Sequence, residues 1–178
     1  MYEKEVCDAI GAELAKTGKE KPVFFDIGAN IGLISMYVAK HSNAMIRSFE
    51  PGITQFPILA MNVIANKLQQ RWAAHNIAFG DKNGVAEFFS SIDERCSGSD
   101  GFLDTKRSPS DSYSYAVETR TLDSWTRDHG LVPDVLKIDV EGAEKMVLEG
   151  AREMIQAHKP VIFLEISEEN LKVYPYGV

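Results

Sequence analysis

The chain has 178 residues, of which 44% are hydrophobic and 25% are charged, and its formal net charge is −7. This length predicts one domain with a sizeable core, and the composition is ordinary for a soluble globular protein. Because the balance is acidic and no dense basic run occurs, we expect no nucleic-acid partner and no anionic membrane surface.

Two cysteines, Cys7 and Cys96, lie far apart and have no metal-ligand or Cys-x-x-Cys spacing. We therefore expect free thiols in a reducing compartment. The charged N-terminus, MYEKEVCDAI, lacks the apolar core of a signal peptide, and no apolar run is long enough to span a bilayer. The expected location is cytoplasmic.

Helical and strand patterns alternate through the first 80 residues. Val6, Ile10 and Leu14 recur at i, i+4 and i+8, which predicts one apolar helix face within residues 3–16. Short apolar runs that end in turn residues predict buried strands, with helices between them. In chain order we expect a strand at 23–27, a helix at 31–41, a strand at 44–50, a helix at 53–68 and a third strand at 72–80.

The second half begins with a turn signal, DKNG at 81–84, and a weakly alternating hairpin strand, VAEFFSS. A long Ser/Asp/Gly segment, 91–114, separates it from the next strand-prone run. The remaining expected elements are a strand at 115–121, a short helix at 121–130, a strand at 135–140, one helix at 141–157 and a last strand at 160–167. Ala143, Val147, Ala151 and Met154 would share the buried face of that last helix.

Strands alternating with helices predict an α/β fold: a Rossmann-like, doubly wound, mostly parallel sheet with helices on both faces, over residues 1–178 as a single domain. In such sheets ligands bind at the carboxyl ends of the strands, near the point where strand order reverses. The residues expected at that edge are Asp26, Gly28, Asn30, Gly32, Glu50, Pro51, Phe79, Gly80, Asp81, Asp139, Glu141, Glu165 and Ser167.

The four histidines do not fit this edge. His41, His129 and His158 fall just before expected strands, and His75 lies within or just before the third strand. We therefore expect structural or surface roles for them.

The loop after the first strand departs from a dinucleotide-binding loop. A G-x-G-x-x-G pattern that starts at Gly28 would need glycines where Asn30 and Leu33 stand. Asp26 would also lie close to a diphosphate, which is electrostatically unfavourable. A carboxylate suits the ammonium group of S-adenosylmethionine (SAM), and Glu50 at the end of the next strand can accept hydrogen bonds from ribose hydroxyls.

Each of these residues also has a structural explanation. Gly28 and Gly32 can serve a tight turn, and Asp26 can interact with a helix dipole. Asn30 can be an N-cap, and Glu50 can be a surface acid before Pro51. Their combination, in order and at one edge of the sheet, favours a cofactor site.

Five motifs resemble the FkbM family of SAM-dependent methyltransferases. They are FFDIGANIGLIS, SFEPG, TLDSW, LKIDVEGAE and VIFLEIS, in that order, and the resemblance covers about residues 22–167. It implies a class I methyltransferase fold, SAM as methyl donor and O-methylation of a hydroxyl on a sugar or other small molecule. The family pattern includes two further strands after FLEIS, and the chain ends too soon for both. The alternatives are a fragment and a shortened member.

The resemblance also implies roles for individual residues. Asp26, Gly28, Asn30 and Gly32 would surround the methionine moiety, Glu50 would bind the ribose, and Phe79, Gly80 and Asp81 would lie near the adenine. Asp139 and Glu141 would face the transferred methyl group. A hydroxyl acceptor must lose a proton, and Asp139 is the leading candidate for that base, followed by Glu141 and Glu165. For Asp139 and Glu141 the alternative is helix capping.

An Asp139–Glu165 pair could bind Mg²⁺, but two carboxylates are few for a metal site, so we make no metal prediction. The 91–114 segment is either a lid over the cleft or a solvated loop. As a lid it would bring Arg95, Lys106 and Arg107 to a charged acceptor. Two other function classes stay open: a nicotinamide-dependent oxidoreductase, which Asn30 and Leu33 disfavour, and a non-catalytic SAM-binding module.

Overall fold

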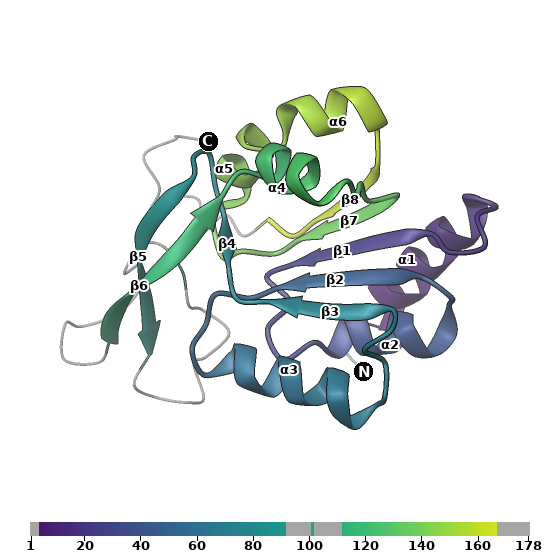
Figure 1. The fold of residues 1–178 in the computed structure, drawn as a ribbon, viewed down its shortest axis with the longest axis horizontal. Coiled ribbons are helices and arrows are strands. Elements are labelled where there is room, and N and C mark those ends of the chain that lie inside the picture. Colours follow the sequence, from purple (N-terminus) through teal and green to yellow (C-terminus); the bar gives the residue numbers. More distant parts are fainter. Residues whose placement is uncertain (1–3, 92–100, 102–111, 167–178) are drawn as a thin grey trace.

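The computed structural model describes residues 4–91, 101 and 112–166 (Figure 1). Most of the 91–114 segment, including Arg95, Lys106 and Arg107, lies outside these residues, as do Cys96 and Ser167. The first half of the described chain forms α1 (Lys4–Lys16), β1 (Val23–Ile27), α2 (Leu33–His41), β2 (Met45–Phe49), α3 (Gln55–Ala65), β3 (Trp72–His75), β4 (Ala78–Phe79) and β5 (Gly84–Ser91). The second half forms β6 (Ser112–Arg120), α4 (Leu122–His129), β7 (Val135–Ile138), α5 (Glu144–Glu149), α6 (Arg152–His158) and β8 (Val161–Leu164).

A five-stranded sheet of order β3-β2-β1-β7-β8 forms the centre of the molecule. All its strand pairs are parallel. The central strand β1 lies between β2 and β7, so the chain winds outward in both directions from this point. The predicted doubly wound fold is therefore confirmed, and its switch point lies between β1 and β7.

Helices cover both faces of this sheet (Figure 1). On one face α1, α2 and α3 pack against alternate sheet side chains such as Phe24 and Ile46. On the other face α4, α5 and α6 pack against Phe25, Leu136 and Ile138. The alternation of Phe24 and Phe25 between the two cores follows from the two-residue period of a strand. In α1 the buried residues are Cys7, Ile10 and Leu14, whereas Val6, expected on that face, is 39% exposed.

The expected third strand, 72–80, is two strands in two different sheets. β3 completes the edge of the parallel sheet, but β4 pairs with β6 in a three-stranded sheet of order β4-β6-β5. The side-chain amide of Asn76, at the break, donates a hydrogen bond to the backbone oxygen of Glu50. This second sheet stands beyond the carboxyl ends of β1 and β2, where Figure 1 shows β5 and β6.

The expected single helix at 141–157 is also wrong, because it breaks at Gly150 into α5 and α6. A Cβ atom at Gly150 would lie 2.0 Å from the backbone oxygen of Gly80. The break thus lets the helical segment pack directly against the loop after β4. Ala143, Val147, Ala151 and Met154 are all buried, so the predicted apolar face is confirmed.

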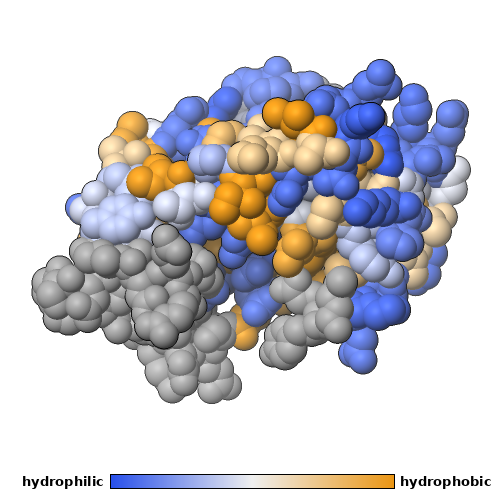
Figure 2. Space-filling model, turned by 90° about the horizontal axis from the view of Figure 1, so that it is seen from below, coloured by the Kyte–Doolittle hydropathy of each residue, from blue (hydrophilic) through white to orange (hydrophobic). Residues whose placement is uncertain are grey.

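Several large apolar side chains on the α3 side are exposed. Ile53, Ile58, Met61 and Ile64 are between 47% and 67% exposed. Figure 2, which views the molecule from below, shows apolar residues gathered on this face. None of the helices in the described ranges is long and apolar enough to cross a membrane.

Candidate cofactor and acceptor site

The glycine loop after β1 has an unusual backbone. Gly28, Asn30 and Gly32 have φ angles of 74°, 51° and 84°. Gly32 is the N-cap of α2, and no side chain in the described part of the chain caps that helix. Asn30, for which capping was the structural alternative, lies two residues earlier with its side chain exposed. The left-handed backbone at these positions turns the chain sharply at the edge where β1 ends, and the N–H group of Gly32 donates to the oxygen of Ala29 within the turn.

Close packing explains both glycines. A Cβ atom at Gly28 would lie 1.7 Å from the backbone oxygen of Asp139, and one at Gly32 would lie 2.5 Å from Leu59 Cδ1. The backbone N–H groups of Gly28 and Ala29 both donate to the oxygen of Phe49. The loop is thus held between the ends of β2 and β7.

Glu50 follows β2 and reaches back to this loop. One carboxylate oxygen accepts the N–H of Asn30 at 2.8 Å, and the other accepts the N–H of Gly52 at 2.7 Å. Only 7% of the residue is exposed, but it lines a cleft. Glu50 therefore braces the loop and also presents negative charge to whatever the cleft holds.

The cleft has an empty volume of about 390 Å³, which includes its open mouth. Among the described residues that line it, most are apolar, and Glu50 is the one with a charged side chain. The lining residues are Ile27, Gly28, Phe49, Glu50, Pro51, Ile77, Ala78, Phe79, Phe88 and Val140. Of the expected site residues, Gly28, Glu50 and Phe79 are brought together here.

Asp26 does not face the cleft. Its side chain is 1% exposed, one oxygen accepts the Ser35 hydroxyl at 2.6 Å, and the other lies 3.5 Å from the Lys137 ammonium. The expected direct contact with a ligand ammonium does not agree with this burial. Asp26 belongs to a buried polar network under the loop.

Asp139 extends from the end of β7 beside the glycine loop. Its N–H donates to the oxygen of Ile27, and its carboxylate accepts Lys137 Nζ at 3.0 Å. The Asp139 side chain is 23% exposed, so it is accessible from solvent while Lys137 and Asp26 are not.

Glu141 lies in the turn between β7 and α5, with a φ angle of 54°. It precedes α5, which begins at Glu144. Glu144 braces the turn, because it is 4% exposed and accepts the N–H groups of Val140 and Gly142 at 3.3 and 3.0 Å. The sequence interpretation missed Glu144, although it is the last acid of the quoted LKIDVEGAE motif.

A family model for the methyltransferase FkbM domain matches residues 26–174. The chain belongs to the FkbM methyltransferase family.

Among curated proteins, this FkbM domain is similar to the 2-O-methyltransferase NoeI of Sinorhizobium fredii (strain NBRC 101917 / NGR234). The two are 28% identical over 166 residues, which cover 86% of this chain and 66% of NoeI. The chain thus spans about two thirds of the length of that relative.

Two solved structures share the fold. Methyltransferase FkbM from Methylobacillus flagellatus KT matches with a TM-score of 0.55 and 19% identity, over 88% of this chain and 38% of that one. Precorrin-6y C5,15-methyltransferase from Geobacter metallireducens GS-15 matches with a TM-score of 0.53 and 13% identity, over 94% and 65%. At these identities the likeness shows a common methyltransferase fold.

The remaining expected site residues of the FkbM domain lie outside the cleft. Gly80 is buried against Gly150, and Asp81 is exposed. Glu165 is also exposed, and its N–H donates to the oxygen of Ile138 beyond the last residue of β8. Ile77, Phe88 and Val140 were missed as cleft residues. Phe88 comes from the β5–β6 hairpin, and only its place in an alternating strand could have indicated burial.

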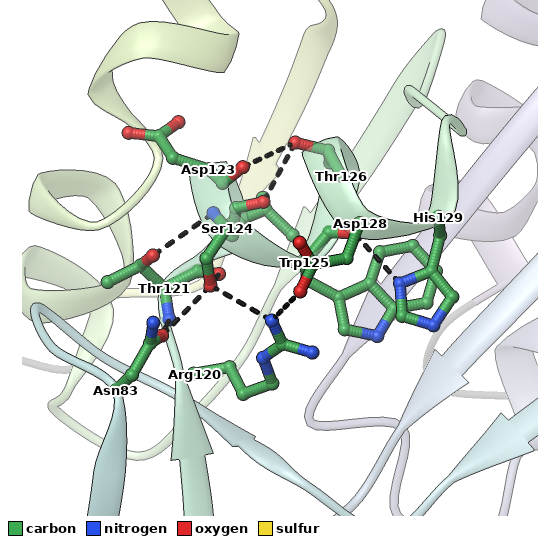
Figure 3. Close-up of polar contacts among 10 residues, drawn as sticks. Asn83, Arg120, Thr121, Asp123, Ser124, Trp125, Thr126, Asp128 and His129 are labelled. Atoms are coloured by element: carbon green, nitrogen blue, oxygen red, sulfur yellow. Dashed lines mark hydrogen bonds and ion pairs between the residues drawn. The ribbon is translucent and has the colours of Figure 1, made fainter.

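The TLDSW motif of the FkbM domain anchors α4. Thr121 is the N-cap and accepts the Ser124 N–H at 3.1 Å. Asn83 accepts hydrogen bonds from the Thr121 N–H and the Ser124 hydroxyl, and Arg120 pairs with Asp128 (Figure 3). These contacts tie the hairpin to α4, which makes the motif structural in this part of the molecule.

His75 lies within the third strand, as expected, but it is the last residue of β3 and therefore stands at the carboxyl edge, which no histidine was expected to reach. Its ring stacks on Phe49 at 5.1 Å and lies 5.3 Å from Trp125. Burial, followed by the charges of Arg47 and His129, lowers the pKa of His75 to about 4. Among the described residues, its buried Nε2 has no hydrogen-bond partner. It is therefore a neutral, half-buried residue at neutral pH, as expected of a structural histidine.

The donor set of the cleft fits the adenosine part of SAM better than a metal ion. The apolar walls suit a flat base, and the Glu50 carboxylate suits a ribose diol. Within the described ranges, no group of three or more His, Cys, Asp or Glu side chains is placed to hold a metal.

Proposed function

We propose that the chain is a single SAM-dependent methyltransferase domain, residues 1–178, that methylates a hydroxyl oxygen of a sugar or other small molecule. The observation that carries this proposal is the apolar cleft at the switch point, with Glu50 as its charged residue beside the glycine loop. Membership of the FkbM family supplies the chemical context.

The cofactor would lie across the ends of β1 and β2. Glu50 would accept the ribose hydroxyls, and Phe79 with Ile77 would contact the adenine. Backbone groups of Gly28, Asn30 and Gly32 would border the methionine moiety. Asp26 would support this loop from below, and Gly80 and Asp81 would act through the position of Phe79.

When bound, SAM supplies an electrophilic methyl group on a sulfonium. The protein's task is to hold the acceptor oxygen in line with that methyl group and to receive the hydroxyl proton. Asp139 is the proposed base, because it is a partly exposed carboxylate whose backbone packs against Gly28. Glu141 and Glu165 are the next candidates.

The acceptor class rests on the relative that is named a 2-O-methyltransferase. A hydroxyl of a sugar ring or a similar small molecule is the class that this name supports. The cytoplasmic location stays a prediction from cysteine usage, and the metal requirement stays open.

The proposal is tested by calorimetric titration with SAM and with NAD⁺, followed by labelled SAM offered with a panel of methyl glycosides. We expect saturable SAM binding, no NAD⁺ binding, and transfer of the label to a hydroxyl oxygen of a glycoside. Binding of SAM without transfer to any hydroxyl compound would favour a non-catalytic module. Preference for NAD⁺ would favour an oxidoreductase.

A further inference from the structure

Lys137 is a buried cation between two carboxylates. Its side chain is 6% exposed, and its Nζ lies 3.5 Å from Asp26 Oδ1 and 3.0 Å from Asp139 Oδ2. A lysine inside an apolar strand such as VLKI is costly to bury unless its charge is compensated. Asp26 is more deeply buried still, so the pair requires an explanation.

The register of the sheet places these groups. Asp26 of β1 is the cross-strand partner of Lys137 of β7. Asp139 follows Lys137 by two residues, and alternate residues of a strand point to the same side. Lys137 can therefore contact its neighbour across the sheet and the carboxylate at the end of its own strand at once.

Asp26 is held in place from its other side. The Ser35 hydroxyl donates to it at 2.6 Å, the Ser35 and Ser48 hydroxyls lie 2.7 Å apart, and the Trp72 ring N–H donates to Ser48 at 2.7 Å. This buried chain of hydrogen bonds fixes Asp26, and Asp26 in turn limits where the Lys137 ammonium can lie.

We infer that Lys137 is a positioning residue for Asp139, an inference that rests on the proposed methyl transfer. Lys137 engages Oδ2 of Asp139, and the described residues offer no hydrogen-bond donor to Oδ1. Oδ1 is then the atom that receives the acceptor proton. In the step, the acceptor oxygen forms a bond to the methyl carbon, and the carbon–sulfur bond breaks with its electron pair going to sulfur. The hydroxyl proton passes to Asp139, while Lys137 keeps its own protons.

A purely structural role would confine Lys137 to neutralising Asp26. The two roles differ in what happens to Asp139 when the cation is removed. Lys137→Met keeps an apolar stem of similar length without a donor, and Lys137→Arg keeps a cation. If Lys137→Met fails to fold because Asp26 is left unpaired, Asp26→Asn with Lys137→Met removes both buried charges.

The experiment combines crystal structures of these variants with SAM affinity and turnover on methyl glycosides. In Lys137→Met the Asp139 carboxylate is expected to leave the position that it has in the wild type, with SAM affinity nearly unchanged and kcat reduced about 10²-fold, as for an impaired general base. Lys137→Arg should restore part of kcat. In an Asp139→Asn background, Lys137→Met should cause little further loss, because the two act as one unit.

An Asp139 side chain that stays in place in Lys137→Met would overturn the positioning role. Losses of kcat that multiply when Lys137→Met is combined with Asp139→Asn would also overturn it. Absence of SAM binding by the wild-type chain would defeat the proposed function instead, and the variant structures would still decide whether Lys137 positions Asp139.

Discussion

At the scale of single residues, burial separates carboxylates that hold the site together from those that can act in it. Asp26 and Glu144 are almost fully buried and accept hydrogen bonds from the protein itself. Asp139 is partly exposed beside the cofactor loop. Glu50 belongs to both groups, because it braces the loop and lines the cleft.

The role of Asp139 predicts a split between binding and turnover. Asp139→Asn removes the proton acceptor but keeps the shape, so kcat should fall by about 10²–10⁴ with SAM affinity nearly unchanged. Glu141→Gln is the comparison, since an acid of the turn should cost little activity. Steady-state kinetics on the acceptor found in the glycoside panel measure both. A large loss in Glu141→Gln with a normal Asp139→Asn would transfer the role to Glu141.

His75 predicts a specific pH dependence of stability. Its pKa is about 4 in the fold and about 6.5 in an unfolded chain, so only the unfolded state takes up this proton between those values. The histidine therefore lowers the free energy of unfolding as the pH falls from 6.5 to 4, and its contribution is constant below that window.

The measurement is urea unfolding of the wild type and His75→Phe across this pH range. Phe keeps a ring against Phe49 but does not titrate. On acidification the free energy of unfolding should fall more steeply for the wild type than for the variant. The difference in slope corresponds to the uptake of up to one additional proton on unfolding. Parallel pH profiles would show that His75 is not held neutral.

At the scale of elements, contacts between segments that are distant in sequence determine where a helix breaks or a strand divides. Local sequence patterns do not predict these positions. The α5–α6 break depends on the contact between Gly150 and Gly80, 70 residues apart in sequence. The strand 72–80 divides because β4 finds its partner in β6, beyond the segment 92–111. Hydrophobic periodicity reports the buried face of an element, as it did for Val147 and Met154, but not where its path bends.

The Gly150 contact predicts that added volume there is destabilising. Gly150→Ala places a methyl group against the Gly80 oxygen and should cost about 1–3 kcal/mol of unfolding free energy. Gly11→Ala is the matched control, because a Cβ at Gly11 meets nothing within 4 Å inside α1. It should stabilise the protein by about 0.5–1 kcal/mol. Denaturant unfolding compares the two, and equal effects would contradict the packing argument.

At the scale of the whole molecule, much of the fold follows from alternating strands and helices. The carboxyl ends of parallel strands meet at one edge, which is why Gly28, Glu50 and Asp139 could be placed near one another from sequence. The cleft wall that contains Phe88 could not, since it arrives through a hairpin of a second sheet. The direction in which the Asp26 side chain points could also not be predicted from the sequence. Its partner, Lys137, lies 111 residues away and is placed by the β1–β7 register.

The central claim is that SAM binds in the cleft beside Glu50. Calorimetric titration of Glu50→Ala against the wild type tests it, with Glu149→Ala, an exposed acid of α5, as the control. Loss of a charged hydrogen-bond acceptor should weaken SAM binding by about 1–3 kcal/mol, whereas Glu149→Ala should bind as the wild type does. Thermal unfolding of each variant checks that the fold is kept. An unchanged SAM affinity in a folded Glu50→Ala variant would contradict the assignment of this cleft.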